Sequence, residues 1–210
     1  EMLKPLRKGQ LAITGGWGNI FESASSTNNW MGFHLGATYT DVLDLLMFKG
    51  NWELSGKYGF NQLVYLTSSG FGPVSRSVLN ENRYQLEFNT IYPLVNFLGI
   101  TGKLLAGVKY VSFDNTTTPT SFTAANLGLV TAFNLFGRQI LARGSYAVPV
   151  SRGTLSTSVN GQPSHLINYE AAINANIFAP ILLGYAGETV VFSGGANRFY
   201  STVFARYFLF

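Results

Sequence analysis

The stretch LMFKGNWELSGKYGF, residues 46–60, decides the fold class of this chain. Its even positions read Leu, Phe, Gly, Trp, Leu, Gly, Tyr and Phe, whereas its odd positions read Met, Lys, Asn, Glu, Ser, Lys and Gly. Because successive side chains of a β-strand point to opposite faces, this segment has one apolar and one polar, charged face if it is a strand. A helix would mix the two sets of residues.

The same alternation recurs along the chain and predicts ten strands. They span residues 10–21, 29–40, 46–60, 82–92, 98–113, 123–135, 139–150, 166–178, 181–192 and 198–210. Short joins alternate with longer ones rich in Ser, Thr, Asn and Gly, so all the longer joins fall at one end of an up-and-down sheet. Eight strands is the alternative if the two weakest segments, 10–21 and 181–192, are not strands.

Charged side chains give a check on the register. Eleven lie within the predicted strands when Arg198, at a strand end, is set aside, and all except Arg206 fall on the polar face. The ten are Lys49, Glu53, Lys57, Arg83, Glu87, Lys103, Lys109, Arg143, Glu170 and Glu188. His34 is also predicted on the weaker, more polar face of its strand. No such segregation is expected of helices or coil.

Composition indicates which face meets water. Only 11% of the residues are Asp, Glu, Lys or Arg, against about 25% in soluble domains, and 47% are hydrophobic. The predicted strands are long, whereas soluble strands average about 5–6 residues and tilted membrane-spanning strands need about 9–11. Aromatic residues of the apolar faces collect near both strand ends, as at two lipid interfaces. We therefore expect apolar faces outward on lipid; a large β-sandwich with an aromatic core is the alternative.

The end of the chain, YSTVFARYFLF at residues 200–210, resembles the terminal strand of bacterial outer-membrane β-barrels. The resemblance rests on the C-terminal Phe and on alternating apolar residues, with Phe204, Phe208 and Phe210 in the register that usually faces lipid. It implies that these three residues are the assembly signal read by the barrel assembly machinery. Arg206 departs from the pattern, because it shares that register.

The resemblance implies the architecture and the location of the protein. We expect an all-β fold with a single closed antiparallel up-and-down transmembrane β-barrel, short periplasmic turns and longer extracellular loops. Residues 1–9 would be a periplasmic N-terminal segment and residues 10–210 the barrel, so both termini would be periplasmic. The expected partners are outer-membrane lipids, lipopolysaccharide and, during insertion, the barrel assembly machinery.

The ten polar-face charges would line the lumen, where an unpaired buried charge costs several kcal/mol. One interpretation is a lumen plugged by ion pairs in a non-catalytic structural or interaction component, for instance a subunit of a larger envelope complex. The alternative is a narrow pore with a weak preference for anions. The plugged interior is favoured, since about 8 strands enclose a filled interior and about 16 open a channel.

An outer-membrane lipid-modifying enzyme is a second alternative. Hydrolytic chemistry needs a nucleophile, a base and an orienting acid, and the nearest set is Ser164, His165 and Glu170. His165 and Glu170 have opposite strand parity, so we predict no enzyme. The chain has no Cys, no paired His and no acidic calcium loop, which predicts neither metal nor cofactor. The Lys and Arg residues are scattered, so no nucleic-acid partner is expected.

The predicted loop 61–81 is unusually apolar, with Leu63, Val64, Leu66 and Phe71. An exposed segment of this kind is expected to be covered. We expect it to fold onto its own barrel; the alternative is a protein partner that contacts loop 61–81 or the barrel wall.

Overall fold

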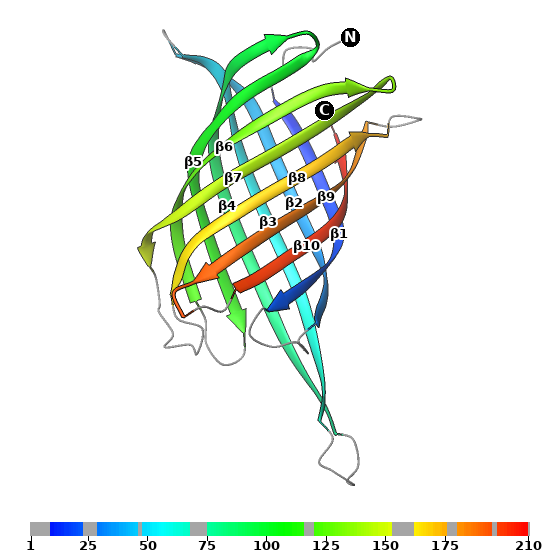
Figure 1. The fold of residues 1–210 in the computed structure, drawn as a ribbon, viewed down its shortest axis with the longest axis vertical. Helices are drawn as coiled ribbons and strands as arrows, with labels where there is room; N and C mark the ends of the chain where they lie inside the picture. Colours follow the sequence, from blue (N-terminus) through cyan, green and yellow to red (C-terminus); the bar gives the residue numbers. More distant parts are fainter. Residues whose placement is uncertain are drawn as a thin grey trace.

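A computed structural model describes residues 9–22, 29–45, 48–67, 75–115, 120–152, 162–175, 180–194 and 197–209. These residues form one closed antiparallel barrel in which each strand pairs with its neighbours in sequence and β1 pairs with β10 (Figure 1). The strands are β1 (Gln10–Glu22), β2 (Asn29–Leu45), β3 (Phe48–Thr67), β4 (Ser75–Phe97), β5 (Ile100–Asn115), β6 (Thr120–Leu135), β7 (Arg138–Arg152), β8 (Pro163–Asn174), β9 (Ile181–Phe192) and β10 (Asn197–Phe208).

The prediction of a ten-stranded up-and-down barrel is confirmed. The two weakest predicted segments are β1 and β9, and both are fully paired on each side. The first and last strands meet in the pair Ala12↔Phe208, at the end of the barrel that carries the short turns (Figure 1). No helix among the described residues is long and apolar enough to span a membrane.

Two of the short turns are two-residue reversals. Leu98 and Gly99 have φ values of 47° and 80°, and Phe136 and Gly137 have 50° and 73°. Positive φ at both central residues gives the backbone twist that matches a β-hairpin, and glycine takes the second position without steric cost. These turns therefore set the register of β4 against β5 and of β6 against β7.

The barrel is apolar outside and carries both polar and apolar side chains inside. Leu54, Leu86 and Leu127 are 47%, 58% and 58% exposed, whereas Asn61 and Asn89, on the other face of β3 and β4, are fully buried. This distribution reverses that of a soluble barrel. An apolar wall around a closed sheet suits hydrocarbon, because closure gives every backbone N–H and C=O of the wall a partner without water.

The prediction of a loop at 61–81 is wrong. β3 continues to Thr67 and β4 begins at Ser75, and their pairing runs without a break from Asn61↔Glu81 to Thr67↔Ser75. This hairpin projects beyond the end of the barrel instead of folding back onto it (Figure 1). The apolar and β-branched residues that suggested a covered loop are typical of strands, and the ladder satisfies their backbone groups. Phe71 lies outside the described residues.

The last strand does not follow the facing that is usual for this register in outer-membrane barrels. Phe204 is 4% exposed and packs inside the barrel with Ala172 and Leu182, and Phe208 packs partly buried against the same cluster. Arg206 shares their register and therefore faces the lumen, where it meets a carboxylate. The outer face of β10 carries Val203 and Tyr207 instead, at 66% and 43% exposure. Phe210 lies outside the described residues.

Candidate functional site

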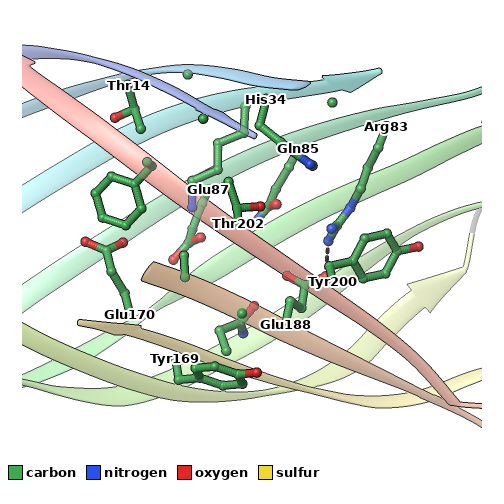
Figure 2. A pocket seen from close by; sticks show the side chains of 18 of the residues that line it. Thr14, His34, Arg83, Gln85, Glu87, Tyr169, Glu170, Glu188, Tyr200 and Thr202 are labelled. Carbon is green, nitrogen blue, oxygen red and sulfur yellow. Dashed lines mark hydrogen bonds and ion pairs between the residues drawn. The ribbon is translucent and has the colours of Figure 1, made fainter. Parts of the chain in front are cut away.

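The lumen is crossed by ion pairs that join opposite walls of the barrel. Glu188 of β9 accepts hydrogen bonds from Arg83 of β4 and Lys109 of β5. All three side chains are at most 8% exposed, and Lys109 also donates to the Asn168 side chain at 2.5 Å. Figure 2 shows Arg83 reaching toward Glu188 beside the ring of Tyr200. One carboxylate of β9 is thus tied to the neighbouring strands β4 and β5 on the opposite wall of the barrel.

A second group is centred on Arg143 of β7. Its guanidinium donates to Glu53 of β3 and to Glu87 of β4, each at 2.7 Å. Glu87 also accepts from the side-chain amides of Asn89 and Asn126, at 2.6 and 3.0 Å. A buried charge is tolerated only when it is paired and hydrogen-bonded, and this carboxylate meets both conditions.

Two further pairs bind β10 from the inside. Arg198 contacts Glu81 of β4 at 2.9 Å, and Arg206 makes a two-pronged contact with Glu170 of β8 at 2.9 and 3.1 Å. Arg206 also donates to the hydroxyl of Thr14 on β1. Neither Arg198 nor Glu81 was among the predicted lumen charges; their strand parity, which matches that of Arg206 and Arg83, is the signal that could have found them.

All the predicted lumen charges take the inward register, but they do not form one network. Every glutamate with a described side chain in the lumen is paired; these are Glu53, Glu81, Glu87, Glu170 and Glu188. In contrast, Lys49, Lys57 and Lys103 have no ion pair with any described residue. Lys49 lies opposite Asp44 in the β2–β3 ladder without an ion pair between them. Among the described lumen residues, cations therefore outnumber carboxylates.

A cluster of apolar side chains packs inside the lumen toward the long connections. Its members are Ile20, Val111, Phe113, Phe122, Ala124, Ala147, Leu166, Val190, Phe192 and Tyr200. Arg83 caps this apolar plug, with its guanidinium carbon 4.1 Å from the centroid of the Tyr200 ring and 5.3 Å from that of Phe113. The expectation of a polar lumen is thus correct only for the remainder. The apolar part of the lumen could have been predicted from Phe113, Phe122 and Phe192, because these residues share the register of inward polar residues.

Next to the ion pairs lies a cavity of about 120 Å³. One wall of the cavity has no side chains at three positions, because β1, β2 and β3 contribute Gly16, Gly36 and Gly59 to it. A Cβ on Gly16 would lie 2.7 Å from Thr202 Cγ2, and one on Gly59 would lie 2.9 Å from His34 Nδ1. The glycines therefore make the room that His34 and Thr202 occupy, and both side chains border the cavity together with Thr14, Gln85 and Glu87 (Figure 2).

The structure separates the grouping considered for catalysis. Ser164 Oγ lies 3.0 Å from His165 Nδ1, but the His165 ring stacks on Tyr146, whose side chain is exposed on the outer wall. Glu170 faces the lumen and is held by Arg206. The acid and the base thus lie on opposite faces of the sheet. Among the described residues no group of three His, Cys, Asp or Glu side chains could hold a metal ion.

Comparison with known proteins shows the fold. Neither a protein-family model nor a curated protein matches the chain. The translocator domain of the autotransporter NalP from Neisseria meningitidis superposes with a TM-score of 0.53 at 9% identity, over 95% of this chain and 87% of that one. The fold is that of bacterial outer-membrane β-barrels.

Two other similar structures have lower TM-scores. The outer membrane protease OmpT from Escherichia coli gives 0.47 at 11% identity, over 100% of this chain and 99% of that one. The attachment invasion locus protein Ail of Yersinia pestis gives 0.36 at 10% identity, over 96% and 97%.

Proposed function

We propose that this protein is an integral barrel of a Gram-negative-type outer membrane that acts without catalysis, as a structural or interaction component. In this proposal the lumen conducts no solute. The short turns and both termini face the periplasm, and the projecting β3–β4 hairpin faces the outside.

The observation that carries the proposal is that apolar side chains and buried ion pairs both occupy the lumen. The apolar plug packs inside the end nearest the long connections, and the ion pairs of Glu188 and Arg143 cross the barrel. Opening a path would expose apolar side chains to water and separate buried ions. Breaking a single buried pair costs about 3–5 kcal/mol, so a path through several pairs is very rarely open.

The non-catalytic part of the proposal is supported by the separation of the candidate residues. A serine nucleophile needs its base and an orienting group within hydrogen-bond reach. Here the Ser164–His165 pair lies on the outer surface, and Glu170 is engaged by Arg206 on the inner one. The outer wall and the hairpin, as the two large surfaces available, are where a protein partner would bind.

Single-channel recording in planar bilayers tests the closed lumen. We expect no stable openings from barrels whose insertion is verified by heat-modifiable gel migration and protease protection. A sixteen-stranded porin, reconstituted at the same protein-to-lipid ratio, is the positive control for detection. Steady openings of the wild-type barrel, with a preference for anions, would replace this proposal by the narrow-pore alternative.

Mass spectrometry of lipid A tests the non-catalytic role. We expect identical lipid A masses after incubation with the folded barrel and with a heat-unfolded sample. Loss or transfer of an acyl chain by the folded protein alone would identify a lipid-modifying enzyme. Substitution of Ser164 by Ala would then show whether the outer Ser164–His165 pair is responsible.

A further inference from the structure

We propose that the lumen cavity beside β1, β2 and β3 binds a small monoanionic oxyanion through Lys57 and His34. This site goes beyond the proposed function and does not depend on it, because an anion can bind in a lumen that does not conduct.

The charge balance of the cavity wall points to an anion. Five cations line it, Lys57, Arg83, Lys109, Arg143 and Arg206, against Glu87, Glu170 and Glu188. Arg143 also neutralises Glu53, which lies outside the wall. Four of the five cations are engaged with these four glutamates, and Lys57 is the member without an ion pair to any described residue. One negative charge is missing from the site.

Lys57 is also placed differently from its paired neighbours. Lys109 is 1% exposed and fully enclosed by its partners, whereas Lys57 is exposed although its position in β3 directs it inward between Ser55 and Gly59, both buried. Its exposed surface therefore borders the open space of the lumen. An ammonium with free donors that faces a cavity is a ready ligand for an oxygen anion, and charge-assisted hydrogen bonds are the strong ones.

The hydrogen-bond donors around the cavity are equally unengaged. His34 has no hydrogen bond with any described residue, although its ring lies in the room made by Gly18 and Gly59. The amide of Gln85, in a residue only 7% exposed, likewise has no hydrogen bond with any described residue. These donors border the cavity and are available to a ligand that carries acceptor oxygens.

The size and composition of the site select the class of ligand. A cavity of about 120 Å³ is roughly eight to twelve times the 10–15 Å³ that one water needs by this measure, so it has room for a small oxyanion together with some of its waters. Glu87 and Glu170 border the same space, and a dianion would be repelled by both. A compact anion with one charge and two or more acceptor oxygens, such as a carboxylate, satisfies Lys57 and the neutral donors together.

Nuclear magnetic resonance of the folded barrel in micelles tests the site with formate as the probe. The chain has two histidines, His34 in the lumen and His165 on the outer wall, so the second is an internal control. We expect the imidazole resonances of His34 to move saturably with formate, while those of His165 stay fixed. Chloride at equal ionic strength should not reproduce the change.

Matched lysine substitutions decide whether Lys57 is responsible. Lys57→Met should weaken formate binding at least about tenfold, which corresponds to about 1.4 kcal/mol. Lys103→Met, which removes another unpaired lumen lysine outside the cavity wall, should leave it unchanged, and Lys57→Arg should retain binding. A linear response of both histidines, full binding by Lys57→Met, or equal losses in Lys57→Met and Lys103→Met would overturn the proposal. If Lys57→Met does not fold, failure of the folded Lys57→Arg variant to bind would overturn it as well.

Discussion

Replacing Glu188 by Gln should strongly destabilise the barrel. Glu188 is 7% exposed and serves two cations, Arg83 and Lys109, which are almost as deeply buried. The substitution keeps the shape of the side chain but removes its charge, so both cations lose their counterion in a medium of low polarity. Removing one partner of a buried ion pair costs about 3–5 kcal/mol, and we expect the upper part of that range here.

The comparison variant is Lys109→Met. It removes one cation, but Glu188 keeps Arg83, and the freed Asn168 side chain retains a contact with Ser145. The expected cost is about 1–3 kcal/mol, that of leaving polar partners less well satisfied. Lys103 has no ion pair among the described residues. The free energy of unfolding of Lys103→Met should therefore lie within about 0.5 kcal/mol of the wild-type value.

Urea unfolding of the barrel in lipid vesicles measures these differences. The three tryptophans report the transition, and Trp17, 57% exposed on the outer wall, senses the loss of lipid contact. We expect the free energy of unfolding to decrease from Lys103→Met to Lys109→Met and to be lowest for Glu188→Gln. The reasoning is refuted if Glu188→Gln unfolds within about 1 kcal/mol of the wild type, or later than Lys109→Met.

Three further predictions concern packing. Phe204→Ala should lower the free energy of unfolding by about 3–5 kcal/mol in the same urea titration, because the ring is buried in the lumen; a near-neutral result would indicate that it faces lipid. Gly107→Ala should cost about 1–3 kcal/mol or prevent folding, as read by heat-modifiable gel migration, since its Cβ would meet a backbone carbonyl of β4, whereas Gly144→Ala, with open space around it, should migrate like the wild type. Gly187→Ala should be destabilising alone and nearly neutral in a Tyr169→Ala background, because the Tyr169 ring covers this glycine; equal costs in both backgrounds would exclude the contact.

The strands and their facing could be predicted because one physical rule applies along nearly the whole wall. A side chain of a closed barrel meets either lipid or the lumen, so the period of two in residues 46–60 returns in the exposure of β3, where Leu54 lies outside and Ser55 and Asn61 inside. Charge reinforces the rule, since a charge on the lipid face is costly while one in the lumen can find a partner.

The rule failed where the lumen itself is apolar. Phe113, Phe122 and Phe204 are hydrophobic residues on the inner register, and no alternation distinguishes a lumen aromatic from a lipid-facing one. In β10 the same ambiguity left the facing of the strand open, although Arg206 departed from a lipid-facing pattern. The partners of each charge were not predictable either, because pairs such as Arg198 with Glu81 join strands far apart in sequence and depend on the shape of the closed barrel.

The contacts of β10 with the interior have a consequence for the order in which the molecule can mature. β10 is the last strand of this sequence, yet Glu81 and Glu170, on strands that precede it, receive their arginines from it. A nascent or truncated chain that stops after β9 therefore holds two acids with no cation from the terminal strand. The ion pairs of Glu81 and Glu170 with β10 therefore form only when the last strand is in place, together with closure of the β1–β10 seam, and they mark the completed barrel.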